Sequence, residues 1–287
     1  MKQIGIIGLG LMGGSMGLAI KKYLPGVKVA GYDLNQNHLN YALKQGMVDQ
    51  ELSPTNIKEM EIIFIAVPVR SIITVLNEIY PEIDLKKTIV TDMGSTKAYL
   101  YQQIKEKFPG LRYVGGHPMT GREVSGPQGA LADLFQNKNY ILFKEAGKIS
   151  SRLTDLLKKI GAEVIYLEPE EHDKLVAFTS HLPQLIATCL VNEIITVEAE
   201  FPLLSRLIGQ GFLDLTRIAA SDPKMWVDIF LTNKDNLITA IDKFTTRLKH
   251  FKDILLDEDT EKIAVLMLSG RNKRQQMEKV SSDGIKG

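Results

Sequence analysis

Short apolar runs alternate with longer helix-like segments along the first part of the chain, up to about residue 167. The runs are rich in Ile, Val, Phe and Tyr, and most are apolar throughout, as expected of strands covered on both faces. This alternation predicts a doubly wound α/β domain, in which a parallel sheet carries helices on both sides. The expected strands are residues 3–7, 28–32, 62–66, 88–91, 113–114, 140–143 and 163–166.

The hydrophobic pattern changes after Glu168. Pro169 followed by two glutamates is typical of the first turn of a helix, and strand-like runs become scarce from there on. We therefore expect two domains, an α/β domain over residues 1–168 and an all-helical domain over residues 169–287. The expected helices are residues 169–198, 202–209, 223–233, 234–256 and 257–271, with a polar, frayed end from residue 273.

The helical domain carries more apolar surface than one small bundle can bury. Several apolar stripes on long helices favour a homodimer that forms through this domain. The most apolar stretch, residues 175–197, contains too many polar side chains for a lipid-facing span. We therefore expect it to be a central buried helix, with no membrane segment.

The composition narrows the class of protein further. The 287 residues include 44% hydrophobic side chains, which indicates a packed core. With 35 basic against 34 acidic residues the net charge is +1, so no basic field exists to bind nucleic acid or a membrane surface. Cys189 is the only cysteine, which excludes a disulfide within one chain and a cysteine-rich metal site, and suits the reducing cytoplasm.

A glycine pattern follows the first expected strand and opens the first expected helix. Gly8, Gly10 and Gly13 form a Gly-x-Gly-x-x-Gly sequence, which is typical of Rossmann-like dinucleotide-binding domains. Gly8 permits a tight turn, Gly10 lets the backbone approach a pyrophosphate, and Gly13 allows the helix to pack closely on the strand. A glycine-rich turn without a ligand is the alternative interpretation.

Asp33 ends the second expected strand, 20 residues beyond Gly13. A carboxylate at this place can bond a ribose 2′-hydroxyl and repels a 2′-phosphate, so the sequence favours NAD over NADP. The alternative is an ordinary turn or N-cap residue before the next helix. The complete set of expected cofactor contacts is Gly8, Leu9, Gly10, Leu11, Met12, Gly13, Asp33, Val67 and Pro68.

His117 is the candidate for acid–base chemistry among the five histidines. It follows Gly115 and Gly116 at the end of an expected strand and precedes Pro118, which disfavours helix at the histidine. Ligands bind at the strand ends of a doubly wound sheet, and an imidazole with a pKa of about 6.5 suits a base at neutral pH. The alternative is a histidine that fixes a loop by hydrogen bonds.

Six short segments carry the most distinctive residue combinations of the chain. They are GLGLMGGS at 8–15, TDMGSTK at 91–97, GGHPMTG at 115–121, EHD at 171–173, SHLP at 180–183 and GFLDLTR at 211–217. The same segments occur in the same order in prephenate dehydrogenases of tyrosine biosynthesis. The chain resembles the monofunctional form of that family, without an appended regulatory domain.

The resemblance implies an oxidative decarboxylation, in which prephenate and NAD give 4-hydroxyphenylpyruvate, carbon dioxide and NADH. It implies that His117 takes the proton of the ring 4-hydroxyl and that Ser95 orients His117 and the reacting oxygen, although Ser95 could also cap the following helix. Arg217 matches the arginine that binds a substrate carboxylate, and Asp214 could hold its guanidinium. Without the resemblance, a plain surface ion pair of these two residues is the simpler interpretation.

Two loop residues after His117 are further expected substrate contacts. Glu123 matches a family acid that gates or lines the pocket, with a solvated loop carboxylate as the alternative, and Thr120 is a further candidate.

Gln184 departs from the family, because many relatives have a second histidine at this position. Neither histidine pairing has a zinc-binding spacing, so no metal site is expected.

His172 and His181 are nine residues apart and point to opposite sides of a straight helix. Pro183 lacks the amide that would bond the carbonyl of Thr179, so a kink near His181 is expected. By resemblance the Ser-His-Leu-Pro stretch faces the active-site cleft, which favours His181 over His172 for substrate contact. Asp173 is expected to support the site.

The resemblance leaves other substrates and functions open. Arogenate differs from prephenate only far from the reacting carbon, so an arogenate or dual-specificity cyclohexadienyl dehydrogenase is the main alternative. A 3-hydroxyacid dehydrogenase relies on a lysine base and has no His-Pro-Met loop. A sensor that binds NADH without turnover would not need His117, Ser95 and Arg217 together.

Overall fold

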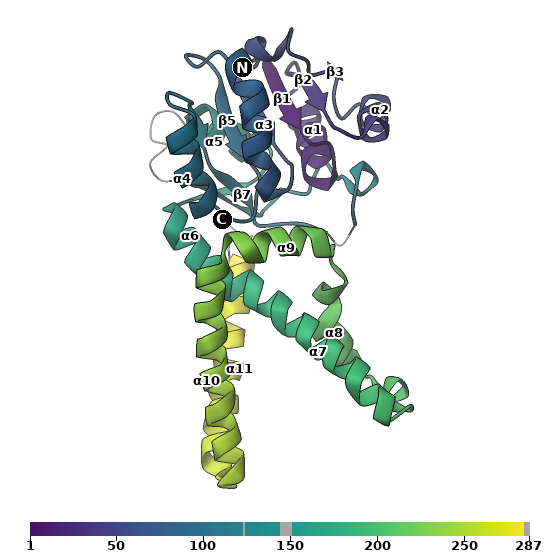
Figure 1. Ribbon diagram of the computed structural model, residues 1–287, viewed down its shortest axis with the longest axis vertical. Helices are drawn as coiled ribbons and strands as arrows, with labels where there is room; N and C mark the ends of the chain where they lie inside the picture. Colours follow the sequence, from purple (N-terminus) through teal and green to yellow (C-terminus); the bar gives the residue numbers. More distant parts are fainter. Residues whose placement is uncertain (123, 144–150, 284–287) are drawn as a thin grey trace. The chain divides into compact units, whose positions relative to one another are not determined.

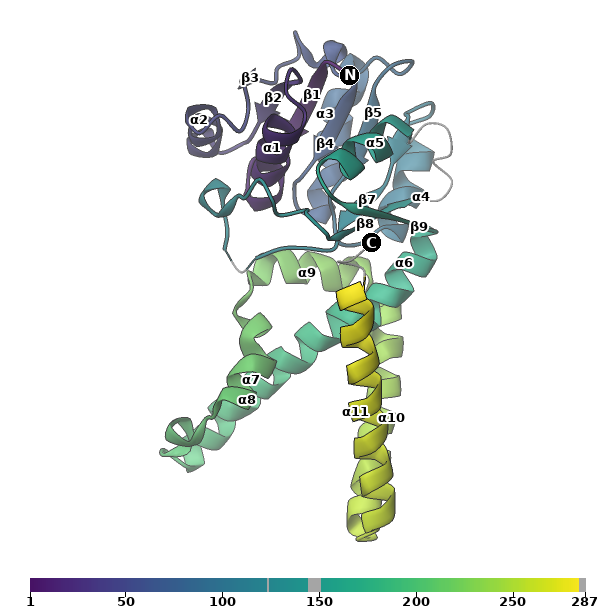
Figure 2. The same cartoon turned by 180° about the vertical axis from the view of Figure 1, so that it is seen from behind.

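The computed structural model describes residues 1–122, 124–143 and 151–283 (Figures 1 and 2). The chain divides into two compact units, Met1–Lys234 and Asp235–Gly287, and each is described by itself. The domain boundary expected after Glu168 marks the place where strands give way to helices along the sequence, and it differs from the division at Lys234. It stays a prediction.

Six parallel strands form the main sheet of the first unit, in the order β3-β2-β1-β4-β5-β6. The order reverses between β1 and β4, so the carboxyl ends of these two strands border the crevice in which doubly wound sheets bind ligands. The predicted Rossmann-like sheet is confirmed, with β3 as a short additional strand at its edge. The strands are β1 (Gln3–Ile7), β2 (Lys28–Tyr32), β3 (Gln50–Glu51), β4 (Ile62–Ile65), β5 (Ile89–Asp92) and β6 (Tyr113–Val114).

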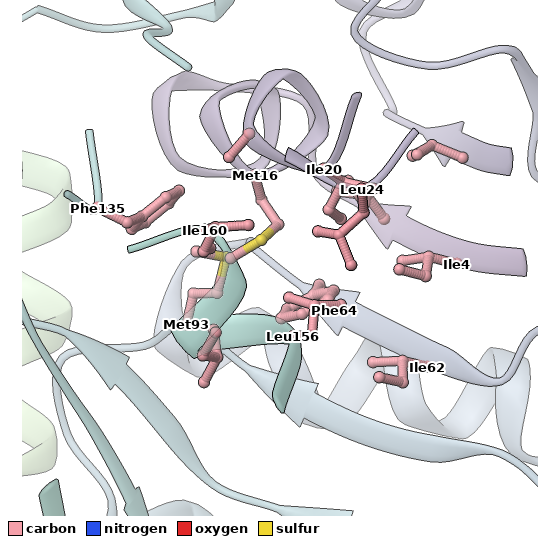
Figure 3. Packing of buried hydrophobic residues seen from close by; sticks show 14 of the residues in the cluster. Ile4, Met16, Ile20, Leu24, Ile62, Phe64, Met93, Phe135, Leu156 and Ile160 are labelled. Carbon is pink, nitrogen blue, oxygen red and sulfur yellow. The ribbon is translucent and has the colours of Figure 1, made fainter. Parts of the chain in front are cut away.

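Helices cover both faces of this sheet because its strands are apolar on both sides. On one face, α1 (Leu11–Tyr23) and α5 (Ser151–Lys159) share an apolar cluster with β1 and β4 (Figure 3). On the other face, α3 (Ile72–Ile79) and α4 (Ala98–Lys107) form a second cluster. Among the described residues of this region, the other helical pieces are α2 (Gln36–Lys44) and the 3-10 turns η1 (Ile57–Glu59), η2 (Val69–Ser71), η3 (Tyr80–Glu82) and η4 (Pro127–Gly129).

Three strands form a separate sheet in the order β7-β8-β9. They are β7 (Gly116–Pro118), β8 (Asn139–Phe143) and β9 (Glu163–Leu167), with β7 antiparallel to β8 and β9 parallel to it. The expectation that residues 140–143 and 163–166 belong to one parallel sheet with the others is therefore wrong. The chain leaves the main sheet at Gly115, where a Cβ would lie 2.5 Å from the Phe143 ring, so only glycine fits this change of sheet.

A long helical stretch follows β9 and is interrupted once. It consists of α6 (Pro169–Val176), a π-helical turn η6 (Ala177–His181) and α7 (Leu182–Glu200). Pro183 lies in the first turn of α7, directly after the π turn, and has no amide to donate to the carbonyls of that turn. The predicted interruption near His181 is therefore present, in the form of a π turn.

The chain then returns through shorter elements. They are η7 (Leu204–Leu207), α8 (Gln210–Thr216), η8 (Arg217–Ala220) and α9 (Pro223–Thr232). The helix expected over residues 202–209 is wrong, because only a 3-10 turn forms there and the extended Gly209 starts α8 instead. The helix expected over residues 223–233 is confirmed to within one residue.

By length and composition, the stretch Pro169–Glu200 could also cross a membrane. It contributes four buried polar side chains to the first unit, namely His172, Asp173, His181 and Gln184. Buried polar groups of this kind require partners that lipid does not offer. They are typical of a helix that packs inside a folded protein at this end of the stretch. Only Leu182, Gln184 and Ala187 of α7 are buried, so the expectation of a central buried helix over residues 175–197 is wrong for most of α7.

Two long helices make up the second unit. They are α10 (Lys234–Leu256), whose first residue still belongs to the first unit, and α11 (Thr260–Asp283), and they run side by side (Figures 1 and 2). The expectation of a frayed end from residue 273 is wrong as far as Asp283, since this segment is rich in Lys, Arg, Gln and Glu, which favour helix.

Candidate active site

The glycine turn joins β1 to α1 and leaves one side of its backbone open. At Gly8, φ is +91° and a Cβ would lie 2.5 Å from the carbonyl oxygen of Ala66, so only glycine fits. At Gly13, a Cβ would lie 1.8 Å from the Gly8 carbonyl oxygen, which explains the close approach of α1. At Gly10, no described atom lies within 4 Å of an added Cβ, so a ligand can reach the backbone at the helix N-terminus.

Asp33 is tied to this turn. Its Oδ2 accepts the backbone amide of Leu9 at 2.7 Å and its Oδ1 accepts the amide of Asn35 at 2.8 Å. His38 Nδ1 lies 3.5 Å from Oδ2. The carboxylate is thereby fixed in direction, and it remains half-exposed at the end of β2.

A cavity of about 400 Å³ lies over the carboxyl ends of β1, β2 and β4. Among its lining residues are Gly8, Gly10, Asp33, Val67 and Pro68. A second cavity of about 260 Å³ shares Tyr32 and Val75 with it and is mostly apolar. Open glycine backbone, a helix N-terminus and a fixed carboxylate are the groups that a dinucleotide needs, so the residues present fit NAD.

The other expected cofactor contacts lie in the same turn. Leu9 is fully buried and belongs to the core, and its amide is already bonded to Asp33. Leu11 and Met12 open α1 and pack against the core cluster. Their side chains are therefore structural, and contact with a cofactor there would come from the backbone.

A chain of three side chains runs through the middle of the first unit. Asp173 Oδ1 lies 2.7 Å from His172 Nδ1, and His172 Nε2 lies 2.8 Å from His117 Nδ1. Asp173 and His172 are fully buried, whereas the His117 ring is half-buried. The bond to His172 occupies one nitrogen of His117 and leaves Nε2 for a substrate.

The Asp173 carboxylate also caps α4. Its two oxygens accept the backbone amides of Lys97 at 2.8 Å and Ala98 at 2.9 Å. A carboxylate from α6 thus does the work of an N-cap for a helix 75 residues away. Ser95, considered as a cap, instead lies in the bend before this helix and is half-buried.

A buried ion pair lies in the same loop. Lys97 Nζ bonds Asp92 Oδ2, and both side chains are fully buried. Asp92 Oδ1 also accepts the hydroxyl of Tyr113 at 2.6 Å and the amide of Gly116 at 3.1 Å. Asp92 thereby connects the ends of β5 and β6 to β7, which carries His117.

Burial lowers the pKa of His117 well below its ordinary value of 6.5, and the neighbouring His172, Lys97 and His181 lower it further. A protonated ring in this place would lose hydration and face Lys97. The imidazole is therefore neutral at neutral pH. A neutral imidazole is the form that can accept a proton.

His181 lies beside the chain of three. Asn233 Nδ2 donates to the backbone oxygen of Asp173 at 2.7 Å and lies 3.1 Å from His181 Nδ1. Nδ1 of His181 is therefore an acceptor, and the proton of the neutral ring is on Nε2. Burial lowers the pKa of His181 to about 4, with Asp173 and His172 acting in opposite directions.

Three buried polar atoms around His181 have no hydrogen-bond partner among the described residues. They are His181 Nε2, Gln184 Oε1 and Trp226 Nε1. The Trp226 ring lies 6.1 Å from the His181 ring, edge to face. Orphaned buried polar groups are costly, so this set is suited to a polar ligand.

The remaining expected substrate contacts are less closely defined. Arg217 is exposed at the start of η8, a turn that packs against α7. Asp214 is exposed on α8 and accepts from Gln210 at 2.8 Å. Thr120 is half-buried three residues after His117, and Glu123 lies outside the described residues.

The structure adds site residues that the sequence interpretation does not assign. His172 contacts His117, Asn233 contacts His181, and the pair of Asp92 and Lys97 fixes the loop between them. The distinctive segments TDMGSTK and EHD contain Asp92, Lys97 and His172, so the sequence marks these three residues without indicating their contacts. Within the described part of the chain, no group of three His, Cys, Asp or Glu residues is arranged to hold a metal.

His117 lies within β7, three residues beyond the end of β6, so the expected loop at this position is a strand. A Rossmann-like sheet, an open glycine turn with a fixed carboxylate, and a neutral imidazole on β7 together define a dinucleotide-dependent oxidoreductase. Two family models match the chain, the nucleotide-binding domain of prephenate dehydrogenase over residues 16–166 and its dimerization domain over residues 168–269. The chain belongs to the prephenate dehydrogenase family.

Individual relatives agree with this assignment. Prephenate dehydrogenase of Bacillus subtilis is 36% identical over 90% of this chain and 71% of its own length. Cyclohexadienyl dehydrogenase of Zymomonas mobilis is 32% identical over 90% of each chain. The crystal structure of A. aeolicus prephenate dehydrogenase in complex with hydroxyphenyl propionate and NAD+ is 32% identical, with a TM-score of 0.87 over 96% of this chain and 98% of that chain.

Proposed function

We propose that this chain catalyses the NAD-dependent oxidative decarboxylation of prephenate to 4-hydroxyphenylpyruvate. Membership of the prephenate dehydrogenase family supports the reaction. The structural observation that carries it is the half-buried His117 ring on β7, which is bonded through Nδ1 and held neutral.

His117 Nε2 is the proton acceptor in this proposal. The 4-hydroxyl of the substrate gives its proton to this nitrogen, while the hydrogen on C4 leaves as hydride with both electrons of the C–H bond. Loss of the ring carboxylate as carbon dioxide leaves its electron pair in the ring, which becomes aromatic, and the 4-oxygen takes the proton back from His117 Nε2 to give the hydroxyl of the product. When bound, NAD supplies the hydride acceptor for this step. Ser95, in the loop before α4, is proposed to orient the hydroxyl.

The chain's own residues would hold NAD through the glycine turn. The backbone at Gly8 to Gly13 and the N-terminus of α1 suit the pyrophosphate, and Asp33 suits a ribose hydroxyl. Val67 and Pro68 line the same cavity. A like-charge clash between Asp33 and a 2′-phosphate favours NAD over NADP.

Substrate carboxylates need hydrogen-bond donors and a cation. The Nε2–H of neutral His181 and the indole N–H of Trp226 are buried donors without a partner among the described residues, and Arg217 is the proposed cation. Asp214, Thr120 and Glu123 are proposed as supporting contacts. Asp173 supports the site through His172 and through the start of α4.

The assembly and location are proposed with the function. A homodimer through the helical part is supported by the match to a dimerization domain and by exposed apolar side chains on α10 and α11. The two family matches meet between residues 166 and 168, which supports a boundary at Glu168. A cytoplasmic location rests on the single cysteine.

The test is the rate of NADH formation with prephenate and with arogenate, each with NAD and NADP. We expect turnover of prephenate with NAD, and a loss of several orders of magnitude in kcat for His117→Asn with nearly unchanged NAD affinity. Preference for arogenate would select the alternative substrate. Unchanged turnover in the variant would remove His117 as the base.

A further inference from the structure

The imidazole of His172 lies between the proposed base and a carboxylate, and both of its nitrogens are engaged. Nδ1 is 2.7 Å from Asp173 Oδ1 and Nε2 is 2.8 Å from His117 Nδ1. The ring is fully buried. It touches the base but leaves no nitrogen for a substrate.

The direction of each bond follows from the Asp173 end. Both carboxylate oxygens accept backbone amides, from Lys97 and from Ala98, and amides can only donate. Asp173 therefore presents an acceptor to His172 Nδ1, which must carry a proton. With this single ring proton on Nδ1, His172 has its lone pair on Nε2, so the proton of the bond to His117 belongs to His117 Nδ1.

We propose that His172 is a positioning residue, which holds His117 in the tautomer with a proton on Nδ1 and a lone pair on Nε2. This inference rests on the proposed function, because it assumes that Nε2 is the nitrogen that meets the substrate. Because His172 donates to Asp173 through Nδ1, its Nε2 accepts from His117 Nδ1, and the lone pair of His117 is therefore on Nε2. A hydrogen-bonded partner of this type sets which ring nitrogen is basic.

The arrangement also bears on the charged state of the base. After His117 takes a proton on Nε2, its Nδ1–H continues to donate to His172, and the Asp173 carboxylate lies one ring away. The interaction with His172 is thus kept throughout the reaction, and the ring does not have to turn. A base without this partner would divide between two tautomers and two ring orientations.

The first experiment observes the tautomer directly in the holoenzyme with NAD bound. Selective 15N-histidine labelling gives ten ring nitrogens from five histidines, and His117→Asn assigns the His117 pair by subtraction. We expect a protonated Nδ1 and an unprotonated Nε2 in the wild type. The opposite pattern, or rapid exchange between both, overturns the proposal without any kinetic measurement.

Two substitutions then test the role of His172. His172→Phe keeps a planar ring but can neither accept nor donate, whereas the His172→Gln carbonyl can still accept from His117. We expect His172→Phe to lose the fixed Nδ1–H signal and to lower kcat about 100-fold or more, with the KM for NAD nearly unchanged. We expect His172→Gln to keep the Nδ1–H signal and to have a kcat about tenfold higher than that of His172→Phe. His250→Gln, an exposed histidine on α10, is the control.

Each outcome is decisive. An unchanged His117 tautomer in His172→Phe, or equal kcat in the Phe and Gln variants, would show that hydrogen bonding at this position does not govern the base. If His172→Phe does not fold, the wild-type spectrum and His172→Gln still decide. If the wild type shows no turnover of prephenate, the proposed function fails, whereas the nitrogen spectrum still reports on the tautomer.

Discussion

Asp33 has two roles that a single substitution can separate. Its carboxylate bonds the amides of Leu9 and Asn35 and also lines the proposed cofactor cavity. Asp33→Ser removes the charge that repels a 2′-phosphate and the acceptor for a ribose hydroxyl. We expect the ratio of kcat/KM for NAD over NADP to fall about tenfold or more.

The matched control for this substitution is Asp49→Ser. Asp49 also bonds a backbone amide, that of Val29 at 2.8 Å, and pairs with Lys21, but it lies outside the cavity. Steady-state rates with both cofactors measure the ratio for each variant. A ratio that stays at the wild-type value in Asp33→Ser would refute the assignment of Asp33 as the selecting residue.

The buried His181 makes stability depend on pH. Its pKa is about 4 in the folded chain against 6.5 as the ordinary value, because burial disfavours the charged ring. Below pH 6.5 the unfolded chain binds a proton that the folded chain does not bind until about pH 4. The free energy of unfolding therefore falls as the pH falls through this window, by on the order of 3 kcal/mol from this residue.

Urea unfolding of wild type and His181→Asn at several pH values between 7 and 4 measures this contribution. The variant should show a shallower loss of stability towards acid, at the cost of lower stability at neutral pH. His250→Asn, which replaces an exposed histidine, should keep the wild-type dependence. Identical pH dependence in wild type and His181→Asn would contradict the burial argument.

At the scale of the elements, the strands and long helices follow from periodicity, but two local departures do not. The pattern of Tyr140 to Phe143 identifies a strand without identifying its sheet, because strand periodicity reports burial and not the partner. The chain changes sheet at Gly115, where a Cβ would lie 2.5 Å from the Phe143 ring, and β8 pairs with β7 and β9 instead of the main sheet.

The second departure changes the site. A straight helix would separate His172 from His181, and Pro183 signals only that the helix is disturbed. The π turn at Ala177–His181 widens one turn and rotates the side chains that follow. His172 bonds the Asp173 carboxylate, and Asn233 links His181 to the backbone oxygen of the same residue. The sequence locates the break, whereas the kind of break decides which side chains meet.

The loop between β5 and α4 is held by a charge pair that should be sensitive to loss of one partner. Lys97→Met leaves the Asp92 carboxylate buried without its cation, and breaking a buried pair in this way costs about 3–5 kcal/mol. We expect the urea midpoint of unfolding to fall accordingly. Because Asp92 also bonds Gly116, next to His117, turnover should fall as well.

Lys21→Met provides the comparison on the surface of the same unit. Its pair with Asp49 is about one third exposed on each side, and pairs of this type contribute about 1 kcal/mol or less. The two substitutions remove the same charge and keep a similar stem. Equal losses of stability in both variants would show that the buried pair has no special weight.

At the scale of the whole molecule, motif order along the sequence identifies the family, but the site itself exists only in the folded chain. His117 comes from β7, His172 and Asp173 from α6, and the bonded amides from the start of α4. No spacing rule connects these elements, because β7, α4 and α6 lie far apart in the sequence and meet only through the fold of the first unit. The role of His172 therefore could not be derived from its sequence neighbours.

The exposed apolar side chains of the second unit lead to a prediction about assembly. Val265, Met267 and Leu268 on α11 are each more than half exposed in one chain, as is Leu256 at the end of α10. Apolar side chains gathered on a pair of long helices mark an interface, and closed twofold dimers are the commonest solution. We expect a particle of twice the 32.0 kDa chain mass in solution.

Sedimentation equilibrium over a range of concentrations tests this for wild type and for the double variant Val265→Glu, Leu268→Glu. The variant should shift towards the single-chain mass, because two buried carboxylates per chain would lack partners in an interface. Lys273→Glu changes charge on the same helix at a position that is already polar, so it should leave the mass unchanged. A wild-type mass of one chain at all concentrations would refute the dimer, and an unchanged dimer in the double variant would place the interface on the first unit, where Phe201, Leu207 and Leu215 are also exposed.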